Sequence, residues 1–188
     1  MRIIAGRWAG MELLSPGDRV RPTMEPLREA SMRFVENELA GARVLDLFAG
    51  TGALGLEAMS RGARYCDFVE NGTSAIHSLK ANVAKVKSRD RARIFLRDAI
   101  PYAEMLSPGA YDIAFVDPPY GSKKLDRVLA RWLVVPFAKV LVLEHAFDHK
   151  LVLPAPVAGA GPVERMRIED SVVTVLRAPA APAPVTAP

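Results

Sequence analysis

The stretch R-V-L-D-L-F-A-G-T-G-A-L-G, residues 43–55, decides how this chain folds. Its apolar first half suits a strand that is buried on both faces of a parallel sheet. Gly50 and Gly52 then mark a tight turn where the backbone can approach a ligand. Good helix formers follow at 53–59, so the unit is strand, glycine loop and helix. Such a unit holds a nucleotide-like ligand over the carboxyl end of its strand, beside the N-terminus of the helix.

The kind of ligand is indicated by two acidic residues. The loop matches G-x-G-x-x-G, and Glu70 closes the next apolar run about 20 residues on, a pattern that taken alone predicts NAD. Asp46 argues against NAD, because a carboxylate that faces the loop would repel a pyrophosphate. A cationic ligand would be attracted instead. S-adenosylmethionine carries a sulfonium, an ammonium group and a ribose that Glu70 can bind. A capping role for Asp46 is the structural alternative, and an NAD-dependent oxidoreductase is the alternative of another class.

A second motif is Asp117-Pro118-Pro119-Tyr120, which follows an apolar run at 111–116 that predicts another buried strand. Its end should lie on the same edge of the sheet as the glycine loop. The two prolines have no N–H, so the Asp117 carboxylate and the Pro118 carbonyl are presented as acceptors. Acceptors without donors suit an exocyclic amine, and the Tyr120 ring can stack on a base. We therefore predict that this motif is catalytic; the alternative is a surface turn.

These motifs together resemble the class I S-adenosylmethionine-dependent amino-methyltransferases. The resemblance rests on D-L-F-A-G-T-G-A-L-G-L-E-A (46–58), on Glu70 and on D-P-P-Y, because [DNS]-P-P-[YFW] marks transfer to an exocyclic or amide nitrogen. M-R-I-I-A-G-R-W-A-G-M-E-L (1–13) and R-P-T-M-E-P-L-R-E-A (21–30) resemble the opening of the RsmD family, which methylates N2 of a guanine in bacterial 16S rRNA. The resemblance covers the chain to about Glu144.

The resemblance implies a fold, a cofactor and a partner. The fold is α/β and Rossmann-like, with a seven-stranded, mostly parallel sheet, helices on both faces, and a short N-terminal hairpin and helix. The cofactor is S-adenosylmethionine. The partner is 16S rRNA, within the small ribosomal subunit or an assembly intermediate, and the methylated position is N2 of guanine 966. An adenine-N6 or glutamine-N5 methyltransferase and a non-catalytic RNA-binding module are the remaining alternatives.

Site residues follow from the motifs and from the resemblance. Asp98-Ala99 resembles the position that meets the adenine of the cofactor, where the carboxylate accepts from N6 and the amide donates to N1. The cofactor-binding candidates are Asp46, Phe48, Ala49, Gly50, Thr51, Gly52, Glu70, Asn71, Asp98 and Ala99. The substrate-binding candidates by resemblance alone are Arg21, Thr23 and Arg28. Lys123, in the polar loop after the D-P-P-Y motif, is a further candidate that faces either a substrate or water. A structural role in tying the hairpin to the domain is the alternative for the first three.

The remaining segments divide the chain into an extension (1–40), a methyltransferase domain (41–177) and an Ala/Pro tail (178–188) that we do not expect to fold. Residues 1–14 predict a hairpin with its turn at 6–10. We expect a helix from an N-cap at Thr23 to about Leu39, helices at 73–86 and 125–133, strands at 65–69, 92–96 and 138–143, and a final hairpin in 151–177 around a turn at 159–162. The family usually carries a Tyr-Gly-Asp-Thr-like stretch where this chain has 167–171.

Composition indicates an ordinary globular protein: 188 residues, half of them hydrophobic, with a net charge of +4. No apolar run approaches the roughly 20 residues of a membrane span, so we expect a cytoplasmic location. A single small domain without an obvious heptad predicts a monomer. The single cysteine, Cys66, falls in a predicted strand and is interpreted as buried, which counts against cytosine-C5 methylation. The three histidines lack metal-site spacing, so no metal is expected. A polyanion would be attracted to the basic cluster Lys80, Lys85, Lys87, Arg89, Arg91, Arg93 and Arg97.

Overall fold

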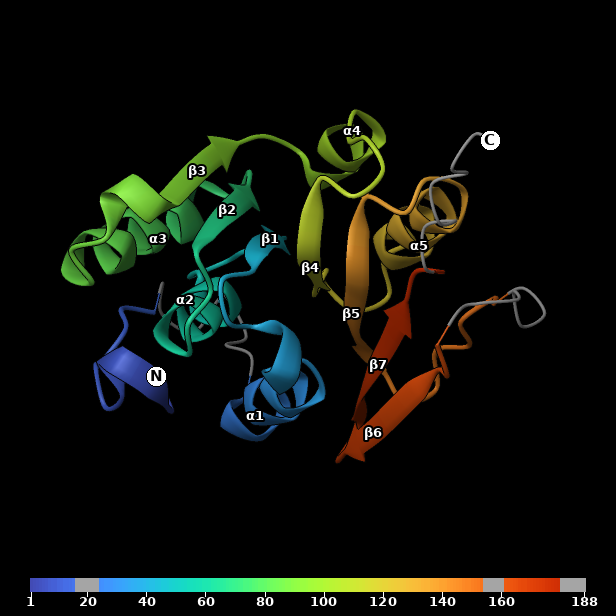
Figure 1. Cartoon of the computed structure of the whole chain (residues 1–188), viewed down its shortest axis with the longest axis horizontal. Coiled ribbons are helices and arrows are strands. Elements are labelled where there is room, and N and C mark those ends of the chain that lie inside the picture. The colour runs from blue at the N-terminus through green and yellow to red at the C-terminus, as the bar shows by residue number, and fades with distance from the viewer. Residues whose placement is uncertain (16–23, 154–160, 180–188) are drawn as a thin grey trace, which may run out of the picture.

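One seven-stranded sheet crosses the molecule in the order β3-β2-β1-β4-β5-β7-β6 (Figure 1). The computed structural model describes residues 1–15, 24–153 and 161–179. β1 to β5 are parallel, whereas β7 runs antiparallel to both of its neighbours. The strands are β1 (Arg43–Leu47), β2 (Tyr65–Glu70), β3 (Ala92–Leu96), β4 (Tyr111–Val116), β5 (Ala138–Ala146), β6 (Glu164–Ile168) and β7 (Ser171–Arg177). The expected seven-stranded, mostly parallel sheet is confirmed.

Helices cover both faces of this sheet. They are α1 (Glu25–Phe34), α2 (Ala53–Ser60), α3 (Thr73–Lys85), α4 (Ala99–Glu104) and α5 (Lys124–Val134), with 3₁₀ turns η1 (Gly6–Trp8), η2 (Glu36–Glu38) and η3 (Arg89–Arg91). Side chains alternate along each strand and so divide the core in two. Val44 and Phe115 pack with α1, α2 and α3, while Leu45 and Ala114 pack with α4 and α5.

Three predicted boundaries are wrong. The first helix ends at Phe34 rather than near Leu39, because the chain tightens into the 3₁₀ turn η2; its N-cap position is Met24. The expected hairpin turn at 159–162 precedes β6 instead of following it. The actual turn between β6 and β7 lies at Glu169 and Asp170, where Glu169 adopts φ 54°. Pairing with β7 also extends β5 to Ala146, beyond the predicted end at 143.

Residues 1–14, here called the N-terminal arm, form the expected hairpin around a turn at 6–10. The Ile3 amide donates to the Met11 carbonyl at 2.9 Å, and one antiparallel bridge joins the two limbs. The arm lies against α2, whose buried Glu57 carboxylate accepts from the amides of Ile4 (2.8 Å) and Ala5 (2.9 Å). These two backbone donors of the arm are thus satisfied by a side chain of the domain. The contact fixes the arm to α2, the helix that follows the glycine loop.

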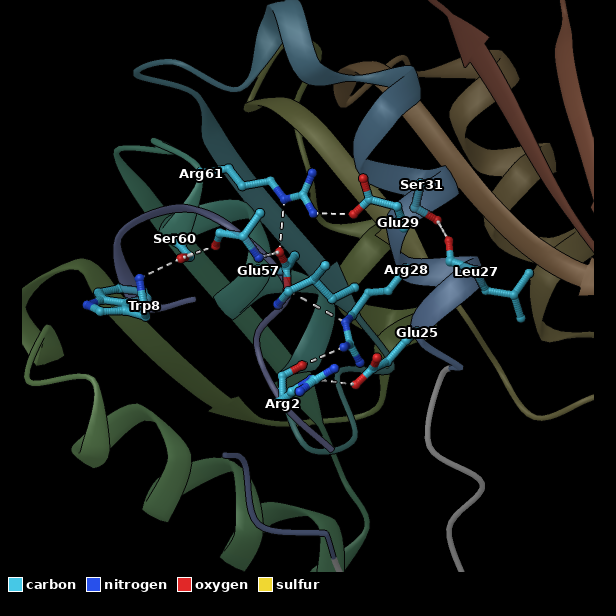
Figure 2. A network of polar contacts seen from close by, with 12 residues as sticks. Arg2, Trp8, Glu25, Leu27, Arg28, Glu29, Ser31, Glu57, Ser60 and Arg61 are labelled. Carbon is cyan, nitrogen blue, oxygen red and sulfur yellow. Dashed lines mark hydrogen bonds and ion pairs between the residues drawn. The ribbon is translucent and has the colours of Figure 1, made fainter. Parts of the chain in front are cut away.

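Arg28 completes this attachment and is fully buried (Figure 2). Its guanidinium donates to the Arg2 carbonyl at 2.6 Å and lies 3.7 Å from the Glu57 carboxylate. Burial lowers the pKa of Arg28, and the Glu57 charge opposes that shift. Glu57 also accepts from Arg61 at 2.9 Å. In this structure Arg28 therefore has the structural role that was the alternative to substrate binding. Arg21 and Thr23 lie outside the described residues.

Candidate active site

Strand register brings four polar side chains to one edge and one face of the sheet. Asp46 pairs with Phe115 across β1 and β4, and Phe115 pairs with Val142 across β4 and β5. Because side chains alternate, residues two positions further along keep the same face. Asp117 and Glu144 therefore follow Phe115 and Val142 and become neighbours at the carboxyl edge. On β7 the same face carries Ser171, two residues before the partner of Glu144.

A cavity of about 550 Å³ opens at this edge. Its volume lies in the range of small-molecule sites, about 300–1,000 Å³. Most of the predicted residues line it: Asp46, Phe48, Ala49, Gly50, Thr51, Glu70, Asn71, Asp117, Pro118, Pro119 and Tyr120. Both predicted motifs thus meet in one cavity. Lys124, the first residue of α5, and Glu144 line it as well. Glu144 had not been predicted, because nothing local distinguishes an acidic residue near a strand end.

Glu70 fixes the conformation of the glycine loop through hydrogen bonds from backbone amides. One carboxylate oxygen of Glu70 accepts from the Gly50 amide at 2.8 Å, and the other accepts from the amides of Asn71 (2.8 Å) and Gly72 (2.6 Å). Phe48, at the start of the loop, has φ 64°, a conformation that is uncommon outside glycine. The carboxylate therefore fixes the loop to the end of β2 and compensates for the strained start of the turn.

Gly52 has a packing role in this structure. It does not line the cavity, and it adopts φ 81°. A Cβ there would lie 2.5 Å from a Leu79 methyl, and one at Gly55 would lie 2.4 Å from the Phe68 ring. These glycines therefore let α2 approach β2 and α3. The G-x-G-x-x-G pattern arises here partly from the contact between helix and sheet.

Asp46 lies under the loop and is 2% exposed. Its carboxylate accepts from the Gly55 amide at 2.9 Å, in the first turn of α2, which is the capping contact given as its structural alternative. The pKa of Asp46 is raised to about 7, mainly by burial and also by the nearby charges of Asp117 and Glu70, while the Gly55 N–H opposes the shift. An acid with this pKa is only partly ionised at neutral pH. A cation in the cavity would favour its charged form.

The Asp117-Pro118-Pro119-Tyr120 motif leaves β4 toward the cavity. Tyr120 is 40% exposed, and its hydroxyl donates to Glu144 Oε1 at 3.1 Å and lies 2.6 Å from Ser171 Oγ. The phenol is anchored at its polar end while part of the ring stays accessible. Burial raises the pKa of Tyr120 to about 12, so it is a neutral hydrogen-bonding group. Its hydroxyl links the motif to β5 and β7.

Three other predicted site residues do not line this cavity: Asp98, Ala99 and Lys123. Asp98 caps α4, where its carboxylate accepts from the Ile100 amide at 2.9 Å, and neither Asp98 nor Ala99 lines the cavity. A 3.3 Å hydrogen bond from the Asn71 side chain joins Asp98 to the cavity rim. Lys123 is an exposed residue at the N-cap of α5 and does not line the cavity. Its neighbour Lys124 does, with its ammonium group 5.6 Å from the Phe48 ring centre.

The N-terminal arm also reaches the loop. The Asn82 side chain exchanges hydrogen bonds with the Leu14 backbone at 2.7 and 3.0 Å and donates to the Thr51 carbonyl at 3.0 Å. Asn82 is fully buried in α3. One amide group therefore links the end of the arm to the glycine loop. Sequence patterns gave no signal for this link, since the partners are far apart in the chain.

Cys66 lies in β2, as predicted. Cys66 is fully buried, and burial raises the pKa of its thiol well above the usual value. Within 1–15, 24–153 and 161–179, no three His, Cys, Asp or Glu side chains are grouped as metal ligands. In the same ranges no helix is long and apolar enough to span a membrane. In the basic cluster, Arg93 pairs with Asp67 at 2.6 Å and Lys85 binds the Glu12 carbonyl.

The strand order, the glycine loop after β1 and the acidic end of β2 define a Rossmann-like class I methyltransferase. The solved structure of Escherichia coli YhhF superposes with a TM-score of 0.81 at 27% identity, over 96% of this chain and 99% of that one. Ribosomal RNA small subunit methyltransferase D of Escherichia coli K12 is 36% identical over 133 residues, 69% of this chain and 65% of its own. The Haemophilus influenzae protein of that name is 31% identical, over 82% of this chain and 83% of its own.

Residues 1–152 match the family described as Conserved hypothetical protein 95. The chain belongs to this family, the RsmD family of rRNA methyltransferases. The resemblance inferred from the motifs is therefore confirmed at the level of the family.

Proposed function

We propose that this protein transfers a methyl group from S-adenosylmethionine to the exocyclic N2 of a guanine in 16S rRNA. We place the reaction in the cytoplasm, on the small ribosomal subunit or a precursor of it, with the enzyme acting as a monomer. Guanine 966 is the position expected from the family resemblance. The observation that carries the proposal is that Asp46, Glu70 and Asp117 line one cavity. The part of the cavity that we propose binds the cofactor therefore adjoins the part that we propose binds the amine.

The cavity suits S-adenosylmethionine in charge and shape. The cofactor has two positive groups near its reactive end, and Asp46 offers a buried carboxylate whose ionisation a cation would favour. Glu70 accepts three backbone amides, which leaves about one of its four acceptor positions for a ribose hydroxyl. We propose that Asn71 and the adjoining Asp98-Ala99 turn receive the adenine at the rim, where the Asn71 hydrogen bond joins the two segments.

When bound, the cofactor supplies a methyl group that its positive sulfur already activates. The remaining barrier lies in the amine, whose lone pair is delocalised into the guanine ring. Asp117 and the Pro118 carbonyl would accept hydrogen bonds from the N2 amine. These bonds would localise the lone pair and direct it at the methyl group. A carbon–nitrogen bond then forms as the carbon–sulfur bond breaks, and N2 loses one proton, which the Asp117 carboxylate takes. The exposed Tyr120 ring would stack on the flipped-out base.

The test is a transfer assay with isotopically labelled S-adenosylmethionine and undermethylated small ribosomal subunits. The RNA is digested and the labelled nucleoside identified by mass. Label in N2-methylguanosine is expected. Label in N6-methyladenosine would support transfer to an amine but contradict guanine as the target base. Label in a protein amide would contradict RNA as the substrate. Cofactor binding without transfer to any of these would contradict the proposal as a whole.

A further inference from the structure

We infer that Glu144 selects guanine by accepting a hydrogen bond from its N1–H, beside the N2 amine that Asp117 receives. This inference rests on the proposed function and deepens it, because the D-P-P-Y motif recognises an amine but not the base that carries it. No sequence motif identifies Glu144. Its assignment comes from the cavity and from strand register alone.

Position is the first argument. Glu144 lies at the carboxyl end of β5, is 7% exposed and lines the same cavity as Asp117. The last pair of the β4–β5 register is Val116–Leu143, so Asp117, the residue after β4, follows beside Glu144. Adjacent strands lie about 4.8 Å apart, so the two carboxylates present acceptors side by side. That spacing suits two neighbouring donors on one flat ligand.

The second argument is how the carboxylate is held. Oε1 of Glu144 accepts from the Tyr120 hydroxyl at 3.1 Å, and the same hydroxyl lies 2.6 Å from Ser171 Oγ. Tyr120 is the residue whose ring we expect to stack on the base. The hydrogen bond therefore fixes the acceptor relative to the stacking surface.

Base chemistry supplies the discrimination. Guanine carries N1–H and the N2 amine side by side, which are adjacent donors. Adenine places the bare lone pair of N1 beside its N6 amine, and cytosine does the same with N3 beside N4. Either base, if its amine bound Asp117, would direct a lone pair at Glu144. A site built around a donor strongly rejects an analogue that lacks it, since its buried polar group is left unpaired.

The test replaces the target guanosine by 2-aminopurine riboside, which keeps the 2-amine but has a bare N1. The RNA is made by splinted ligation and reassembled into small subunits. For the wild-type enzyme we expect kcat/KM on 2-aminopurine to fall at least about 100-fold relative to guanosine. In Glu144→Gln the amide N–H can donate to a bare N1. The ratio of kcat/KM on guanosine to kcat/KM on 2-aminopurine should therefore fall at least about tenfold, through a loss of activity on guanosine.

Controls separate this role from a structural one. 6-Thioguanosine keeps N1–H while losing the C6 oxygen, so the wild type should still prefer it to 2-aminopurine. Tyr120→Phe removes the hydrogen bond to Glu144 but keeps the carboxylate, and it should slow both substrates while retaining the base preference. Glu104→Gln changes an exposed carboxylate on α4 and should alter neither rate. Cofactor affinity within about twofold of wild type in Glu144→Gln verifies the fold.

Equal wild-type rates on guanosine and 2-aminopurine would overturn the inference without any variant. So would an unchanged preference in Glu144→Gln. In both cases N2-methylguanosine still forms, and the proposed function stands. Absence of N2-methylguanosine with the wild-type enzyme would instead reject the proposed function, and this inference with it.

Discussion

The Gly50 amide donates to the Glu70 carboxylate at 2.8 Å, across the space between the ends of β1 and β2. A residue predicted as a cofactor ligand thus also shapes the loop that we propose contacts the cofactor. The two roles use the same carboxylate. Substitution at Glu70 should therefore act on the loop and on the ligand together, which distinguishes it from a residue that only touches ligand.

Glu70→Ala should weaken S-adenosylmethionine binding at least tenfold, about 1.4 kcal/mol, because the loop loses its anchor and the ribose loses an acceptor. The thermal midpoint of the ligand-free protein should also fall. Isothermal titration and thermal melts measure the two effects. Glu104→Ala, at an exposed site, is the matched control and should leave both unchanged. A variant with full affinity would contradict the proposed role.

Cofactor affinity should depend on pH through Asp46. Its pKa of about 7 in the free protein should be lower in the complex, since the bound cation favours the ionised carboxylate. Affinity should therefore rise with pH up to about 7, level off above it, and fall by up to about tenfold per unit below it. Titrations between pH 5 and 8 would measure this. Asp46→Asn should bind more weakly and show no such slope; a parallel slope in the variant would assign the titration to another group.

The same residue should oppose stability in the ligand-free protein. The folded pKa of Asp46 is raised above the ordinary value of 3.8, so its contribution is most favourable below that value and is lost as pH rises through about 7. Asp46→Asn removes the charge. We expect its thermal midpoint at pH 8 to exceed that of wild type by several degrees, and the difference to shrink at pH 5. A lower midpoint at pH 8 would show that the hydrogen bond to Gly55 matters more than the charge.

Asp117→Ala should lower turnover by about 10²–10³ and change cofactor affinity by less than about threefold, because the carboxylate acts on the amine. Single-turnover transfer and equilibrium titration separate the two quantities. Asp117→Asn keeps one acceptor and should retain more activity than the alanine variant. Near-normal turnover in Asp117→Ala would exclude the proposed mechanism.

Glu57→Ala should release the N-terminal arm. The change removes the acceptor for two arm amides and leaves the buried Arg28 charge without that carboxylate. Breaking such a buried pair costs about 3–5 kcal/mol, or a fall in thermal midpoint of about 10 °C for a chain of this size. Limited proteolysis should cut the arm. Glu29→Ala, which removes a more exposed partner of Arg61, should cost less than about 1 kcal/mol.

The parts of the fold that carry strong local patterns were predicted from sequence. The buried parallel strands read as apolar runs, and β3 begins and ends at the expected residues, 92 and 96. Prediction failed where tertiary packing decides. Gly159 to Pro162 have a stronger turn signal than Glu169-Asp170, yet pairing of β7 with β5 selects the latter. The helix α4 contains Pro101 and is short, so no helical period marked it.

The residues of the candidate site also fall into those that local sequence patterns could predict and those that they could not. Asp46, Glu70 and Asp117 stand at strand ends within recognisable motifs, so their convergence could be predicted. Glu144 could not, because its place follows from the pairing of β5 with β4 and β7 rather than from its neighbours in the chain. Arg28 matched a family motif, but its burial against Glu57 depends on how the arm folds back.

The shared face of Asp46, Asp117 and Glu144 limits how this enzyme can be altered. Strand interiors tolerate exchange among apolar side chains of similar volume. A single inserted or deleted residue within β4 or β5 would instead turn Asp117 or Glu144 to the face of α4 and α5. Strand length is thus under tighter constraint than strand composition. An engineer who wishes to change the accepted base should keep every strand at its present length and vary only the residues that stand at the carboxyl ends.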